Sequence, residues 1–127
     1  MAKNVNQSEP LFIGTDHQFV LTVLNGAETE AVDITSFAMS FMLKRHRSDL
    51  DADALVTKTT VSGIAISGTY NVDPDVNTQV ATATVADTDT DSLTEGLVHF
   101  EWKRTDAGFE AVLAYGTLPL RRGVHRT

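Results

Sequence analysis

Short segments in which apolar and polar side chains alternate at every second position constrain the fold of this chain more than any other feature. The clearest segment spans residues 37–44, whose alternate positions are Phe37, Met39, Phe41 and Leu43. A second segment spans residues 97–104 and repeats the pattern with Val98, Phe100 and Trp102. Because successive side chains of a β-strand point to opposite faces, each segment predicts a strand with one buried face. Each large apolar side chain contributes about 1.5–3 kcal/mol when fully buried, so we expect residues 37–44 to lie centrally in a sheet.

Turn signals divide the rest of the chain into further short strands. They include Asn25-Gly26, Ser62-Gly63, Asp73-Pro74-Asp75 and Asp106-Ala107-Gly108. Between them we expect strands in residues 11–13, 17–24, 55–61, 64–66, 79–86 and 109–120, and a loop with about one helical turn in residues 87–95. No long helix alternates with these strands, so the sheets should be mostly antiparallel. The pattern therefore predicts an all-β, mostly antiparallel β-sandwich of about 7–8 strands.

The apolar faces of the expected strands define one core. We predict that this core contains Phe19, Leu21, Phe41, Leu43, Val98, Phe100, Trp102 and Leu113. For Trp102 the alternative is an exposed platform for a sugar ring, but its alternation with Val98 and Phe100 favours a buried position.

A chain of 127 residues has the length of one domain and can bury a core without disulfides or metals. We expect an N-terminal arm in residues 1–10, the sandwich in residues 11–120 and a basic C-terminal arm in residues 121–127. The first residues lack the apolar run of a secretory signal, and no apolar stretch is long enough for a membrane-spanning helix. We therefore expect folding in a cytoplasm and no membrane partner.

The net charge of the chain argues against one class of binding partner. The net charge is −7 and the pI is about 4.8, which argues against a nucleic-acid partner, because neutralising phosphates requires surplus Lys and Arg. The basic residues that we identify as candidate assembly contacts fall in two groups, Lys44, Arg45 and Arg47 in one and Arg121, Arg122 and Arg126 in the other. Such groups favour a solvated face with a flexible end; the alternative is a head-to-tail electrostatic match between copies of the protein.

Two acidic segments, residues 49–53 and 87–91, carry Asp at every second position, which is how a calcium-binding loop begins. The sixth position holds Ala54 or Ser92 where Gly is needed, and the twelfth holds Thr60 or Val98 where Glu is needed. We therefore predict no metal site. The carboxylates are expected to cap backbone amides of surface loops, with weak calcium binding left open.

The sequence contains no pattern of catalytic residues. Its four histidines are not spaced as metal ligands, and it has no Gly-x-Ser-x-Gly turn and no phosphate-binding or dinucleotide-binding glycine motif. We therefore expect no catalytic residues, no cofactor and no enzymatic activity. A small hydrolase stays an alternative that no sequence feature favours.

The order of several short motifs is similar to that of a known family. The motifs are Gly14-Thr15-Asp16, Val32-Asp33-Ile34-Thr35 before residues 37–41, Gly63-Ile64-Ala65-Ile66-Ser67-Gly68, residues 86–93 with Gly96 after them, residues 99–108, and Ala114-Tyr115-Gly116-Thr117-Leu118. In this order the chain resembles the small immunoglobulin-like β-sandwich proteins encoded among the structural genes of tailed bacteriophages and prophages. It is similar in outline to the N-terminal domain of phage baseplate upper proteins, over residues 11–120.

The resemblance implies an immunoglobulin-like sandwich in which the Asp-Thr-Asp loop forms a corner between sheets, with Leu93 in the core and Gly96 permitting the next turn. It also implies a non-enzymatic virion part: a head decoration, a neck or tail accessory, or a baseplate subunit. The partners would be other copies of the chain and other virion structural proteins, in an oligomer within the particle. The alternative is a host-surface carbohydrate-binding module, which requires exposed aromatic side chains in a cleft.

Overall fold

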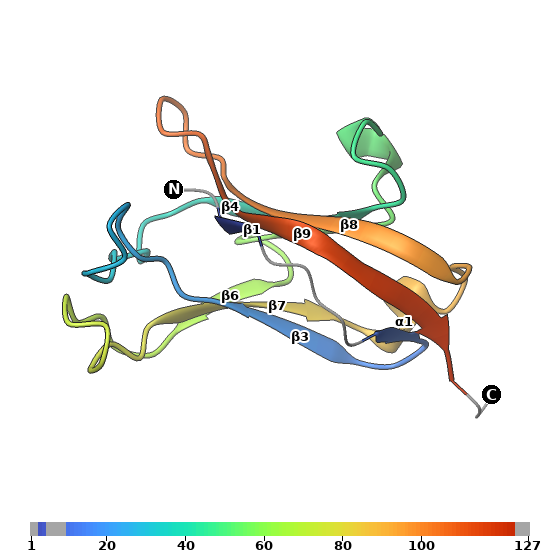
Figure 1. Ribbon diagram of the computed structural model, residues 1–127, viewed down its shortest axis with the longest axis horizontal. Helices are drawn as coiled ribbons and strands as arrows, with labels where there is room; N and C mark the ends of the chain where they lie inside the picture. Colours follow the sequence, from blue (N-terminus) through green and yellow to red (C-terminus); the bar gives the residue numbers. More distant parts are fainter. Residues whose placement is uncertain (1–2, 5–9, 124–127) are drawn as a thin grey trace.

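The alternating segments form strands of two sheets that face each other (Figure 1), in a computed structural model that describes residues 3–4 and 10–123. The larger sheet contains, in spatial order, β1 (Lys3–Asn4), β9 (Ala111–Arg122), β8 (Gly96–Arg104), β4 (Met39–Lys44) and β5 (Val56–Thr59), and β2 (Leu11–Ile13) also pairs with β9. The smaller sheet has the order β3 (His17–Leu21), β7 (Val80–Val85) and β6 (Ile64–Ser67). Two short helical turns, η1 (Asp51–Asp53) and α1 (Asp87–Thr90), lie in connections between strands.

Neighbouring strands are antiparallel, except that β1 and β2 run parallel to β9. The predicted all-β class with mostly antiparallel sheets is therefore confirmed, and the arrangement is consistent with a β-sandwich.

The core lies between the two sheets, where the alternation predicts it. In β4, Met39, Phe41 and Leu43 are buried, whereas the residues between them are only partly buried. Of the predicted core residues, Phe19, Phe41, Leu43, Val98, Phe100 and Trp102 are buried, and Leu21 and Leu113 are partly buried against them. Trp102 is 3% exposed, so the buried position that we predicted for it is confirmed.

The connection from β7 to β8 crosses from the smaller to the larger sheet through α1. Thr90 is fully buried at this corner, and its Oγ1 accepts a hydrogen bond of 2.9 Å from the backbone N–H of Gly14. Leu93 packs against the core, and Gly96 has a φ of 145°, which favours glycine. The predicted helical turn and corner are therefore both present.

The buried side-chain amide of Gln79 holds the connection from β3 to β4 in place through hydrogen bonds. Gln79 is 5% exposed, and its Oε1 accepts a hydrogen bond of 3.0 Å from the backbone N–H of Ile34. Its Nε2 donates to Asp33 Oδ1 at 3.1 Å and to Thr35 Oγ1 at 2.8 Å. The alternation of residues 79–86 could not reveal this role, because its partners Asp33, Ile34 and Thr35 lie more than 40 residues away in the chain.

Two turns differ in detail from the sequence expectation. At Asn25-Gly26 the residue with left-handed φ is Glu28, at 58°, because the Asn25 side chain accepts a hydrogen bond from the backbone N–H of Thr29 and so closes a wider loop. After β8, Gly108 has the expected positive φ of 84°. Phe109, however, lies outside β9 and is 64% exposed.

The expected boundaries of the two arms also differ from the structure. Strand β9 continues through Arg122, because Arg121 and Arg122 pair with Phe12 and Ile13 of β2. Residues 3–4 of the expected N-terminal arm form β1 and pair with β9. Strand pairing satisfies backbone groups whatever the side chains are, so these residues extend the sheet although few of their side chains are apolar.

Replacing Phe41 by Ala should lower the free energy of unfolding by about 3–5 kcal/mol. The Phe41 side chain is fully buried, and its ring centroid lies 4.8 Å from that of Phe19 and 5.1 Å from that of Trp102, so truncation leaves a cavity between the sheets. Urea denaturation followed by tryptophan fluorescence measures the change. A loss below about 1 kcal/mol would contradict the central position of Phe41.

Candidate functional site

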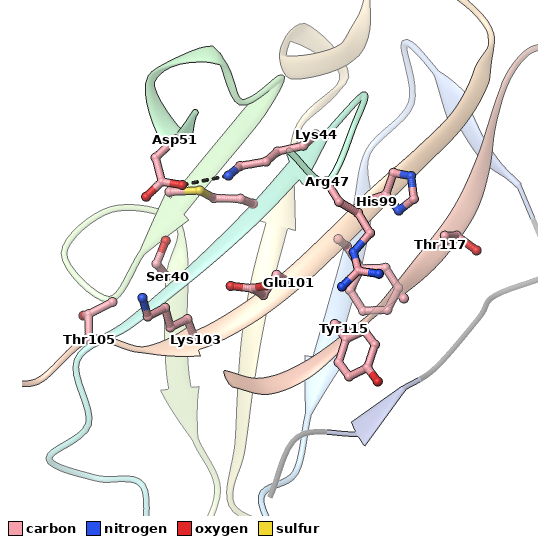
Figure 2. Close-up of a pocket in the computed structure, with 13 residues that line it drawn as sticks. Ser40, Lys44, Arg47, Asp51, His99, Glu101, Lys103, Thr105, Tyr115 and Thr117 are labelled. Carbon is pink, nitrogen blue, oxygen red and sulfur yellow. Dashed lines mark hydrogen bonds and ion pairs between the residues drawn. The ribbon is translucent and has the colours of Figure 1, made fainter. Parts of the chain in front are cut away.

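A groove of about 380 Å³ lies on the outer face of the larger sheet. Figure 2 shows its floor, which is built from outward side chains of β4, β8 and β9, and its wall, which is the loop between β4 and β5. The charged residues that line it are Lys44, Arg47, Asp51, Glu101 and Lys103. The groove exists because alternation that buries one face of these strands turns the intervening polar residues outward.

Strand register brings the lining residues together from distant parts of the chain. Met42 of β4 is opposite Glu101 of β8, which is opposite Tyr115 of β9. Ser40 is opposite Lys103 in the neighbouring row. These side chains therefore form adjacent rows across the floor, with apolar and charged groups side by side.

The wall of the groove is fixed by Lys44. Its Nζ lies 2.7 Å from Asp51 Oδ1 and donates to the backbone carbonyl of Asp49 at 3.0 Å. The Asp49 carboxylate in turn accepts a hydrogen bond from the backbone N–H of His46 at 3.1 Å. The hydrogen bond from Lys44, followed by the charges of Lys44 and then Lys103, holds the pKa of Asp51 below its ordinary value.

Two cations of the groove, Arg47 and Lys103, are not neutralised by an ion pair with a described carboxylate. In Figure 2, Arg47 extends from the wall toward Glu101 and Tyr115, and Lys103 rises from the floor. Within the described residues neither cation is within ion-pair distance of a carboxylate. The Ser40 hydroxyl is buried in the floor, and within the same residues it has no hydrogen-bond partner. The groove can therefore bind a carboxylate, and its Tyr115 and Met42 side chains add apolar surface.

Charge is divided unequally between the two sheets. Residues 4–43 and 59–102, which include all of the smaller sheet, contain no Lys or Arg. Within the described residues the same stretches carry Asp16, Glu28, Glu30, Asp33, Asp73, Asp75, Asp87, Asp89, Asp91 and Glu95 in the connections between strands, and Glu101 on β8 of the larger sheet. Each Lys or Arg within the described residues lies on a strand of the larger sheet or in the β4–β5 loop. The smaller-sheet side is therefore acidic, and the cations belong to the larger-sheet side.

The structure separates the six predicted contact residues. Lys44 and Arg47 line the groove, whereas Arg45 and Arg122 bind the loop before β8: Arg45 Nη2 donates to the carbonyl of Thr94 at 2.9 Å, and Arg122 Nη2 to that of Leu93 at 3.3 Å. Arg121 is exposed on β9, and Arg126 lies outside the described residues.

Of the groove residues, sequence reasoning identified only Lys44 and Arg47 as candidate contacts and missed the others, which include Glu101, Lys103 and Tyr115. The alternation indicated that Glu101 and Lys103 point outward, but only the strand register shows which residues of β4 and β9 lie beside them. Hence no motif marked the site.

Carboxylates of the Asp-rich segment 87–91 stabilise the local structure through hydrogen bonds and an ion pair. Asp89 Oδ2 accepts a hydrogen bond from the backbone N–H of Ala86 at 2.7 Å and lies 2.8 Å from Lys58 Nζ, and Asp87 Oδ1 accepts one from the backbone N–H of Thr88. Across residues 3–4 and 10–123, no group of three or more His, Cys, Asp or Glu could hold a metal ion. No helix in this part of the chain is long and apolar enough to cross a membrane.

Comparison of the chain with known proteins finds no matching family model, no matching curated protein and no matching solved structure. Its function is therefore argued from the distribution of charge and from the groove.

Replacing Lys44 by Met should raise the pKa of Asp51, and replacing Lys103 by Met should raise it less. Lys44 acts through a direct hydrogen bond, whereas Lys103 acts only through its more distant charge. A carboxyl whose pKa is lowered by folding stabilises the fold above its unfolded pKa, and this stabilisation disappears as the pH falls. NMR titration of the carboxyl carbon measures the pKa; an unchanged value in Lys44→Met would contradict the assigned ion pair.

Thermal melting in calcium and in a chelator should give midpoints that agree within about one or two degrees. The Asp89 carboxylate already binds a backbone amide and Lys58, and a cation would have to displace both. A cation that binds only the folded chain raises the melting temperature. An upward shift of several degrees with calcium would show that one of the acidic loops binds it.

Proposed function

We propose that this chain is a non-enzymatic structural protein of a tailed-bacteriophage virion, built as an immunoglobulin-like β-sandwich. It acts by assembling with copies of itself and with other virion structural proteins, as a head decoration, a neck or tail accessory, or a baseplate subunit. It folds in the host cytoplasm before it joins the particle. The order of its motifs and the pairing of two mostly antiparallel sheets support this proposal.

The single observation that carries the proposal is the division of charge between the two sheets. The smaller-sheet side is acidic and contains no Lys or Arg, whereas Arg47, Lys103 and Arg121 are exposed on the larger-sheet side. Complementary charges steer two proteins into one relative orientation and disfavour the contact of like surfaces. Many copies of such a chain can therefore stack in a regular array with a fixed direction.

The outer face of the smaller sheet offers a second surface for assembly. Its outward residues on β3 and β7 include Gln18, Val20, Thr82 and Thr84, and Ala65 lies beside them on β6. None of these five side chains is charged, and Val20 is 62% exposed. Charged residues are depleted in the centres of protein interfaces, so this face can be covered by a neighbour without removing charges from water.

The carbohydrate-binding alternative is less well supported. Trp102, the residue that the sequence offered as a platform for a sugar ring, is buried between the sheets. The Phe109 ring is exposed, but the Arg104 guanidinium lies 4.9 Å from its centroid. Assembly therefore remains the function that we propose.

Particles purified from a host infected with the parent phage should contain this protein, and particles from a deletion mutant should lack it. Purified protein added to the deletion particles should bind, and binding should weaken at least about tenfold when the salt concentration rises from about 0.05 to about 0.5 M, because salt screens exposed charges. Particles that already carry the protein are the matched control.

Cosedimentation with the particles measures this binding. Absence of the protein from purified wild-type particles would contradict the proposed function. Equal binding to deletion and wild-type particles would indicate non-specific adsorption, and would also contradict it.

A further inference from the structure

A rigid acidic turn projects from the smaller sheet between β6 and β7, at the end of the sandwich where the yellow-green loop lies in Figure 1. Asn71 Oδ1 accepts a hydrogen bond of 2.9 Å from the backbone N–H of Asp73, and Asp73 Oδ1 accepts one of 3.0 Å from that of Asp75. The Asp73 carbonyl accepts further bonds from the backbone N–H groups of Val76 and Asn77. The turn is therefore held in one shape and loses little conformational freedom when it binds.

The tip of this turn, residues 72–76, combines carboxylates with apolar side chains. Asp73 and Asp75 are exposed, and they are flanked by Val72 at 49% and Val76 at 56% exposure. The Asp75 side chain forms no hydrogen bond or ion pair with any described residue. The nearest Lys or Arg in sequence are Lys58 and Lys103, so no adjacent cation along the chain neutralises the tip.

The groove on the larger sheet has the complementary chemistry. The Lys44–Asp51 ion pair is neutral as a whole, so Arg47 and Lys103 bring two cations beside the single carboxylate of Glu101. Met42 and Tyr115 bring apolar surface within the same volume of about 380 Å³. The groove therefore offers cations to the carboxylates of residues 72–76 and apolar surface to their valines.

We propose that the groove of one copy receives residues 72–76 of a second copy, with Asp75 near Lys103 and Arg47. The proposal rests on the proposed function in that it assumes contacts between copies. Carboxylate–cation pairs fix the register of the contact, and the valines cover Met42 and Tyr115.

The positions of turn and groove determine the kind of assembly. The turn belongs to the smaller sheet and the groove to the outer face of the larger one, on opposite layers of the molecule (Figure 1). The contact joins two different surfaces, so in a pair of copies one keeps its groove free and the other keeps its turn free for further neighbours. Such heterologous contacts produce rings or filaments.

The test exchanges the charges of turn and groove. Asp75→Lys and Lys103→Glu should each weaken self-association at least about tenfold, because each variant opposes like charges. An equimolar mixture of the two variants, and the double variant Asp75→Lys with Lys103→Glu, should regain association, because lysine then meets glutamate. Asp73 is left unchanged, since its side chain holds the turn.

Sedimentation velocity at low salt measures association, at up to about 1 mM protein, since contacts made by a few side chains have dissociation constants of that order. Glu110→Lys is a matched control that makes the same change of net charge as Asp75→Lys at an exposed position outside the turn and the groove. This control should associate as the wild type does. Circular dichroism checks that each variant keeps its strand content.

Three results would overturn the proposal: a wild-type protein that stays monomeric, a double variant that associates as weakly as the single ones, or a Glu110→Lys control that fails as completely as Asp75→Lys. If association is instead abolished by tetra-aspartate at matched ionic strength and the charge exchange does not restore it, the groove is a general anion site and the proposal is wrong. Any of these results leaves the proposed virion role standing if the protein is present in particles.

Discussion

The two sheets meet through the ring of Phe19, and the rest of the molecule depends on this contact. Phe19 is the buried aromatic residue of β3, and its ring centroid lies 4.8 Å from that of Phe41 and 6.4 Å from that of Phe100. Aromatic pairs at such distances contribute about 0.5–1.5 kcal/mol beyond the area that they bury. The apolar faces of β4 and β8 point toward Phe19. The opposite face of these strands must therefore be formed by Ser40, Glu101 and the outward residues beside them. The groove is thus a direct consequence of how the core packs.

Polar contacts in the connections between strands then fix the position of one sheet relative to the other. Thr90 joins α1 to the end of β2 through Gly14, and the Lys58–Asp89 pair joins α1 to β5. Gln79 does the same for the β3–β4 connection. A buried hydrogen-bonding group left without its partner costs about 1–3 kcal/mol, so each of these side chains specifies one arrangement more than it adds net stability. Most carboxylates that first suggested a calcium loop therefore have a structural role.

The sequence was sufficient to predict the core and the class of fold, because alternation is a local property that residues 37–44 and 97–104 show by themselves. It was insufficient for the groove, because Ser40 and Lys103 become neighbours only through the pairing of β4 with β8. It was also insufficient for Arg45 and Arg122, which bind the same loop before β8 although they are far apart in the chain. The extension of β9 through Arg122 could not be predicted for a related reason: Arg121 and Arg122 pair with β2, and no local pattern of side chains indicates that pairing.

The division of charge between the two sheets likewise depends on the whole fold. It limits the relative orientations in which two copies of the chain can bind. A net charge of −7 makes identical chains repel one another at long range. The acidic loops of two smaller-sheet sides brought together would oppose carboxylates, whereas an acidic loop that meets the groove of the larger sheet finds Arg47 and Lys103. Repulsion between like surfaces therefore disfavours contact between two sets of acidic loops, which is consistent with the head-to-tail contact that we propose. Directional assembly thus requires only that the cations be confined to one sheet, as they are in the part of the chain that the structure describes.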